Sequence, residues 1–469
     1  MKRDEPVIGL FAIGLEAYWS QFPKMKKKLE NLYKIVLKKI EKEGKVLSAG
    51  IVDSHKTARK TGAKFSSEGV DIIFCYCATY STSSNMLPVV SDNDVPVILL
   101  NLQPVASLNN TKINSIGDWL STCTSACIPE MTAVLTKNQV IFDVITGLLE
   151  NDDIVNKEIK DWCQAARVSE NLKNSKIGII GHPYSGMMDL YIDETNLYKR
   201  LKIFPEFVEM DMIKKFIEKT TSTEVNKYKS LIKKTFSYNR DVEDKMDLLA
   251  KSTAAISKLC SERKLNSLSY HYSGLNFEQY ENIIATANVV FSILTSRGIP
   301  CSVEGDIKVS IAMRILKIIS GVSNLVELYS MDFNKDLCIM GHSGPIDNNI
   351  SNNKATISMT EVFHGKSGKG FLTKTNIKEG PVTIIALTEN SNGGFKIVAA
   401  EGKCVSGSML DLGDTNAAIK FPIKMRNFVN RWSKEGPTHH GAITIGNQTD
   451  VLEKTAKLLD IDFVSVCKY

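Results

Sequence analysis

Short apolar runs alternate with a helix-period segment over residues 7–104, and this alternation constrains the fold more than any other feature of the chain. The runs VIGLFAI (7–13), GVDIIFCYCATY (69–80) and VPVILLNLQP (95–104) have the length and side chains of strands. Residues 25–43 repeat apolar side chains at helical spacing. Strands alternating with helices are typical of a parallel sheet with crossover helices, so we expect a doubly wound α/β domain over residues 1–172.

The same pattern starts again after the polar segment 169–175. KIGIIGHPYSGMMD (176–189) has the pattern of a strand that runs into a Gly-rich turn. Further strands and helices are predicted downstream, at 267–272, 277–298, 299–303 and 308–321. We therefore expect a second doubly wound parallel-sheet domain over residues 173–328.

From about residue 330 the apolar runs become short, rich in β-branched residues and divided by Gly, Asn and Pro. ENSNGGFK (389–396) has the composition of a hairpin turn. This composition predicts a third domain over residues 329–469 that is mainly antiparallel and barrel-like, with a sandwich as the alternative.

Composition excludes several classes of protein. The net charge of +6 comes largely from the lysines of residues 24–45, which we expect on the solvent-exposed face of an amphipathic helix. No tract of interleaved basic and aromatic residues supports nucleic-acid binding. Apolar runs of 18 residues are absent, and Asp4 and Glu5 interrupt what otherwise resembles a secretory signal, so we expect no membrane span. The ten cysteines show no CxxC spacing. Reduced core thiols in a soluble cytoplasmic protein are expected, including Cys75 and Cys77 on one face of a strand.

Acidic and imidazole side chains follow several of the predicted strands. Glu304 comes directly after the strand 299–303, Glu327 follows the next helix, and His342 ends an apolar run. Carboxylates and imidazoles from strand ends would suit Mn²⁺ or a similar divalent ion. The alternative is structural: Asp306 fits a helix N-cap well, Glu304 fits one less well, and a strand-end histidine is often only hydrogen-bonded.

These segments occur in a specific order. EGD (304–306) is followed by Lys308, Arg314, Ile315 and Lys317, then by VELY with Glu327, MGH with His342, and the pair His439 and His440. The order resembles the L-arabinose and L-fucose isomerase superfamily, and more closely its arabinose-isomerase branch. The resemblance implies that Glu304, Glu327, His342 and His440 bind one Mn²⁺, with Co²⁺ or Mg²⁺ as alternatives. His439 would be a neighbour oriented toward the substrate or a further partner.

Weaker matches imply where the sugar lies. The resemblance implies substrate contacts from loops at the ends of the predicted strands, namely Glu16, Tyr80, Met187, Met188 and Tyr272. Tyr80, Tyr272 and Trp19 would offer flat apolar faces to the sugar, although each also suits an ordinary core. The chain departs from the family pattern at GPTHHGAIT (436–444) and at Glu16, where arabinose isomerases carry a glutamine.

The resemblance therefore implies a sugar ketol-isomerase that converts a pentose or 6-deoxyhexose through an enediolate. Glu304 and Glu327 would be the catalytic carboxylates, with Glu304 favoured as the base at carbon. A metal-dependent sugar aldolase or lyase and a non-catalytic sugar-binding protein are the alternatives. The family also implies a trimer or hexamer, whereas the sequence identifies neither the sugar nor the physiological metal.

Overall fold

The computed structural model describes residues 5–109, 113–173, 175–272, 280–361, 369–405, 410 and 414–469. The chain forms two compact units, Met1–Asn171 and Leu172–Tyr469. The three-domain division stays a prediction. Its boundary at residue 328 falls inside strand β11 (Asn324–Asp332), which places Glu327 in the C-terminal sheet.

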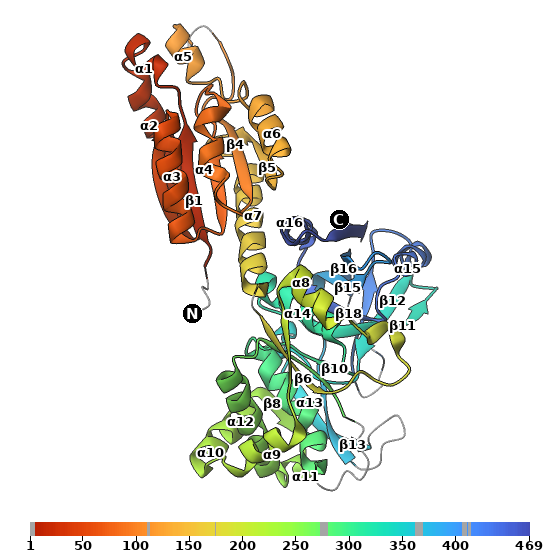
Figure 1. The fold of residues 1–469 in the computed structure, drawn as a ribbon. Helices are drawn as coiled ribbons and strands as arrows, with labels where there is room; N and C mark the ends of the chain where they lie inside the picture. The colour runs from red at the N-terminus through yellow and green to blue at the C-terminus, as the bar shows by residue number, and fades with distance from the viewer. Residues whose placement is uncertain are drawn as a thin grey trace. The chain divides into compact units, whose positions relative to one another are not determined.

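The N-terminal unit is built on sheet A, which has helices beside it (Figure 1). Its strands are all parallel and follow the order β2-β1-β3-β4-β5. The strands are β1 (Val7–Ile13), β2 (Lys45–Val52), β3 (Ile72–Tyr76), β4 (Val97–Gln103) and β5 (Phe142–Leu148). The helices are α1 (Ala17–Gln21), α2 (Met25–Ile40), α3 (His55–Glu68), η1 (Ser83–Asn85), α4 (Leu87–Val90), α5 (Ile116–Leu120), α6 (Ile128–Lys137) and α7 (Asp153–Leu172).

Every residue of β1 is buried, which is typical of a parallel strand covered by helices on both faces. Alternate residues of β1, such as Val7 and Phe11, share a core with α3, α4 and α6. Tyr33 of α2 instead donates a hydrogen bond to the Leu10 carbonyl. Cys75 and Cys77 lie in the core that β1 shares with α3, α4 and α6, as expected. All ten cysteines are free thiols.

The second unit contains the parallel sheet B, in the order β10-β9-β6-β7. Its strands are β6 (Lys176–Gly181), β7 (Phe204–Phe207), β9 (Ser267–His271) and β10 (Cys301–Val303). The helices that accompany it are η2 (Met188–Leu190), α8 (Glu194–Leu201), α9 (Met210–Glu218), α10 (Ser222–Thr235), α11 (Arg240–Glu243), α12 (Met246–Arg263), α13 (Glu281–Ser296) and α14 (Ile307–Ser320). Residues of α9, α12 and α13 pack on one face of this sheet.

A small sheet C joins distant parts of the chain in the order β14-β13-β8. Its strands are β8 (Phe236–Tyr238), β13 (Ala355–Glu361) and β14 (Lys369–Lys374), and β8 pairs with β13 in parallel. Strand β13, which falls in the region expected to form the C-terminal β domain (329–469), therefore pairs with a strand from the preceding α/β region. The apolar run that contains it, KATISMTEVFH, spans residues 354–364. Its residues 362–364 lie outside the described part.

Sheet D has the order β15-β18-β11-β12-β17-β16-β19, and β15 also pairs with β16. It is antiparallel except for the pairing of β16 with β19. Beside β11, its strands are β12 (Leu337–His342), β15 (Gly380–Glu389), β16 (Phe395–Val405), β17 (Thr415–Lys420), β18 (His440–Ile445) and β19 (Asp462–Cys467); η4 (Asn348–Ile350), α15 (Met425–Lys434) and α16 (Thr449–Leu459) belong to the same region.

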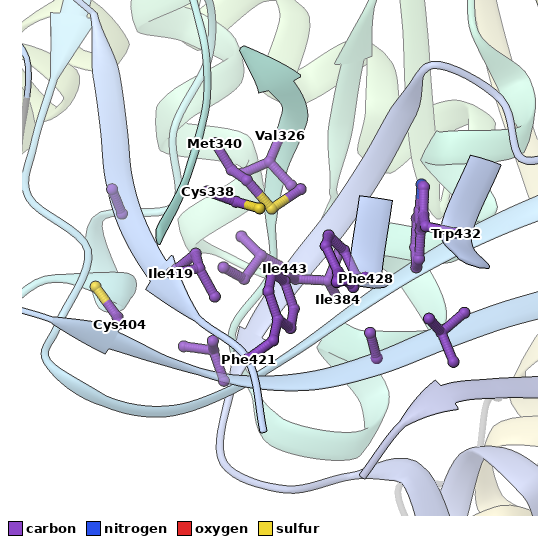
Figure 2. Close-up of a cluster of buried hydrophobic side chains, with 14 of the residues drawn as sticks. Val326, Cys338, Met340, Ile384, Cys404, Ile419, Phe421, Phe428, Trp432 and Ile443 are labelled. Carbon is purple, nitrogen blue, oxygen red and sulfur yellow. The ribbon is translucent and has the colours of Figure 1, made fainter. Parts of the chain in front are cut away.

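The core of sheet D packs side chains of several strands against α15 (Figure 2). Phe428 of α15 stacks on Phe421, with ring centroids 3.5 Å apart. On the other side α14, almost entirely buried, contacts β9 and β10 of sheet B and β15 and β18 of sheet D. One apolar helix thus joins the two sheets into a single unit.

The predicted class is confirmed: parallel sheets A and B precede a mainly antiparallel sheet D. The barrel-like closure of sheet D stays a prediction. Among the described residues no helix is long and apolar enough to span a membrane.

Candidate active site

Strand pairing in sheet D brings three of the predicted ligands together. Glu327 on β11 lies opposite His440 on β18 and opposite Gly341 on β12, next to His342. The rings of His342 and His440 have centroids 5.1 Å apart. Directly opposite residues on paired strands are close enough for their side chains to interact, so the register pairs Glu327 with His440. His342 joins them at the end of β12.

Glu304 reaches the same place from sheet B, directly after β10, as its sequence position predicts. Its backbone is left-handed, with φ of 59°, and Gly305 follows with φ of 75°. A Cβ on Gly305 would lie 2.5 Å from the Cα of Pro183, so only glycine fits the turn. Asp306 then caps α14 by accepting the Val309 N–H at 3.0 Å, as expected. The strand end and the helix start therefore fix the Glu304 backbone from both sides.

His440 is fully buried between two carboxylates. Its Nδ1 lies 3.0 Å from Asp306 Oδ2 and its Nε2 lies 3.4 Å from Glu304 Oε2. Burial lowers the pKa of His440, but hydrogen bonding to Asp306 and the adjacent Glu304 carboxylate outweigh it and raise the pKa to about 9. Among the described residues, Nε2 is a buried atom without a partner in hydrogen-bond geometry. This nitrogen is therefore directed at the carboxylate, and it becomes available to a metal ion once its proton leaves.

The other groups differ in protonation. Burial lowers the pKa of His342 to about 3, which keeps that ring neutral. Burial also raises the pKa of Glu327. It would do the same for Glu304, but the neighbouring imidazoles of His439 and His440 hold the pKa of Glu304 well below its usual range. The site thus contains one firmly ionised carboxylate and one that holds its proton more readily.

The donor atoms fit a divalent cation. Glu304, His439 and His440 offer atoms within 4.8 Å of one another, and so do Glu327, His342 and His440. His440 belongs to both groups. Imidazole nitrogens combined with carboxylate oxygens suit Mn²⁺ and neighbouring ions, and the unpartnered, buried Nε2 of His440 is what a ligand to such an ion requires.

His439 is held differently from its neighbour. Both its backbone N–H, at 3.0 Å, and its ring Nδ1, at 2.7 Å, contact Asp189 Oδ2. Its Nε2 lies 3.8 Å from Glu304 Oε2. The nearby carboxylates of Glu304 and Asp189 outweigh burial and raise the pKa of His439. Asp189 was not among the predicted site residues, because a contact across 250 positions leaves no local pattern in the sequence.

A cavity of about 370 Å³ adjoins these groups. Met187, predicted to be near substrate, lines it, whereas Met188 is 77% exposed and is not among the lining residues. Tyr272 is also not among them, and its ring instead meets Tyr280 edge-on. The sequence prediction missed several other lining residues: Tyr184, Tyr270, His271, Tyr329 and Phe371.

The remaining predicted sugar contacts lie in the N-terminal unit. The indole N–H of Trp19 donates to Asp53 at 2.9 Å, and Lys26 also contacts this carboxylate at 3.0 Å. The Tyr80 hydroxyl donates to Glu130 at 3.3 Å. Glu16 is exposed immediately before α1. Their contacts with a sugar, and that of Tyr272, stay predictions.

Comparison with known proteins gives matches to one family. Residues 322–462 match the family model described as the L-arabinose isomerase C-terminal domain. An L-arabinose isomerase of Mannheimia succiniciproducens is 24% identical over 182 residues, which cover 37% of this chain and 36% of the relative. L-arabinose isomerase 2 of Bacillus licheniformis is 19% identical over 333 residues, 69% of each protein. The chain thus matches about a third of the first relative's length and about two thirds of the second's.

Proposed function

We propose that this chain, a member of the arabinose isomerase superfamily, is an aldose–ketose isomerase that requires a divalent cation, Mn²⁺ first among the candidates. The observation that carries the proposal is the convergence of Glu304, Glu327, His342 and His440 beside one cavity. When bound, a divalent cation polarises a carbonyl and stabilises negative charge on the oxygens of the sugar. Co²⁺ and Mg²⁺ are the alternatives.

The two glutamates divide the proton transfers. Glu304 stays ionised, so it is the better acceptor for the proton that leaves carbon and returns to the neighbouring carbon. Glu327, whose pKa burial raises, is suited to moving the hydroxyl proton between the two oxygens. Acid and base roles separate because the two environments shift the pKa values in opposite directions.

The cavity supports a small uncharged sugar as the substrate. Of its lining residues in the described ranges, none is Lys or Arg, whereas Glu304 and Glu327 are both acidic. The described lining therefore offers no Lys or Arg to pair with a phosphate or carboxylate on the sugar. A pentose or 6-deoxyhexose is therefore our proposed substrate class.

An assay of the purified chain tests the proposal. After dialysis against a chelator and addition of Mn²⁺, ketose formation is measured over L- and D-pentoses, fucose and their epimers. Glu304→Gln should remove turnover while the circular dichroism spectrum stays unchanged, and Glu206→Gln, which changes a carboxylate on strand β7 outside the cavity lining, is the control. Absence of turnover with Mn²⁺, Co²⁺ and Mg²⁺ would refute the activity, and retro-aldol products would favour a lyase.

Two further points belong to the same proposal. The superfamily resemblance suggests a trimer or hexamer, which light scattering on the eluting protein measures. It also suggests a cytoplasmic enzyme, and the ten reduced cysteines support that location.

A further inference from the structure

The loop that carries Asp189 is anchored at both ends. It leaves β6 at Gly181, where φ is 84° and a Cβ would lie 1.7 Å from the His271 carbonyl oxygen. The Tyr184 N–H donates to the Glu304 carbonyl at 2.9 Å. Beyond Asp189, the buried Lys308 donates to the Tyr191 carbonyl at 2.7 Å. The carboxylate is therefore presented by a segment fixed to the backbone of Glu304 and to helix α14.

One oxygen of Asp189 accepts two hydrogen bonds from the same residue. The backbone N–H and the ring Nδ1 of His439 both reach Oδ2. Burial would raise the pKa of Asp189, but these hydrogen bonds outweigh it and lower the pKa. Because an ionised carboxylate only accepts, Nδ1 must carry the proton. The other ring nitrogen is then the one that faces Glu304.

The adjacent histidines thus have parallel arrangements. Each has its Nδ1 on an aspartate and its Nε2 toward Glu304: His440 with the buried Asp306, and His439 with the half-exposed Asp189. His439 lines the cavity, whereas His440 is not among the lining residues. A carboxylate that fixes the tautomer and orientation of a neighbouring imidazole is a recurring device at reactive sites.

We propose that Asp189 is a positioning residue, which holds His439 with Nδ1 protonated and Nε2 aimed at Glu304 and the reacting end of the sugar. The role in turnover rests on the proposed isomerase function. The orientation of the ring does not, because it follows from the contacts of Asp189 alone. Within the described part of the chain, the hydrogen bonds of Asp189 reach the candidate metal site through His439.

The orientation is tested first, without any activity. The chain is labelled with ¹⁵N-histidine, and the ring signals of His439 are assigned by their loss in His439→Gln. In the natural chain we expect His439 signals typical of a protonated, hydrogen-bonded Nδ1. In Asp189→Ala this pattern should disappear, while the His440 signals stay unchanged. The same His439 signals in both proteins would overturn the proposal. Asp193→Asn is the matched control, since Asp193 lies in the same segment, caps α8 and does not line the cavity.

A double-mutant cycle tests the catalytic consequence. Asp189→Ala and His439→Gln should each lower kcat/KM by about 10- to 100-fold, the usual cost of removing such a supporting partner. Combining them should cost no more than His439→Gln alone, because the aspartate acts through the histidine. Asp189→Asn keeps an accepting oxygen and should recover part of the loss, while the affinity for Mn²⁺ stays unchanged.

The outcomes separate the two proposals. If the natural chain isomerises no sugar, the proposed function fails, and the ¹⁵N spectra alone decide the orientation of His439. If the natural chain is active but the two losses multiply, Asp189 acts independently of His439 and the positioning role is wrong. Kinetics of Asp189→Ala equal to those of the natural chain would also overturn it.

Discussion

Binding of a divalent cation should release one proton, and that proton should come from His440. Asp306 and Glu304 raise the pKa of His440 to about 9, so near neutral pH the ring of the cation-free site is protonated on both nitrogens. A cation that takes Nε2 must displace one of those protons. His342, with its pKa of about 3, and Glu304, whose pKa is held low, contribute none.

The magnitude follows from this competition. Below the pKa of His440, apparent affinity for Mn²⁺ should rise about tenfold for each pH unit, or about 1.4 kcal/mol of binding free energy. The sign is fixed: binding strengthens as pH rises from 7 to 8 and levels off above about 9, where the ring is already neutral. Burial raises the pKa of Glu327, so any proton that this carboxyl holds would add to the release on cation binding.

Isothermal titration calorimetry in two buffers with different ionisation enthalpies measures the number of protons released for each cation bound. We expect about one per Mn²⁺ at pH 7. Asp306→Asn removes the charge that holds the proton and should flatten the pH dependence, whereas His55→Gln, at an exposed histidine that begins α3, should not. No proton release at pH 7, or an affinity independent of pH between 7 and 8, would refute the assignment of a protonated His440.

Two predictions concern stability, and denaturant unfolding measures both. Lys317 contacts the buried Asp347 at 2.5 Å, so Lys317→Met leaves an uncompensated charge and should lower the free energy of unfolding by about 3–5 kcal/mol. The control is Lys335→Met, at an exposed pair with Asp332, which should lower it by less than about 1 kcal/mol. Equal losses would contradict this account. Phe428→Ala removes a fully buried ring stacked on Phe421 and should cost about 3–5 kcal/mol; a loss below about 1 kcal/mol would show that the core closes around the gap.

The sheets were predictable because their strands carry local signals. Largely apolar runs such as β1 and β4 predict buried parallel strands, and the structure confirms sheets A, B and D. Sheet C was not predicted. Strand β8 has three residues and pairs with a strand more than a hundred positions later, so no short-range periodicity marks it.

Some residues of the candidate site could likewise be predicted from local sequence signals, and others could not. Glu304 and Asp306 could be placed from sequence because a strand end and a helix start fix their positions. Asp189 could not be found, since its partner lies 250 positions away. Near the end of β9 the prediction selected Tyr272, which follows the strand, but Tyr270 and His271 line the cavity. Adjacent strand residues point to opposite faces, so alternation could not predict that both of these would line it.

The central position of β11 has a consequence for how the protein matures. A slip of one residue against β18 would turn Glu327 to the opposite face and away from His440. Chains with misaligned strands would therefore lack a complete ligand set, even if they were compact. Tight cation binding would then distinguish correctly paired molecules from those trapped with shifted strands.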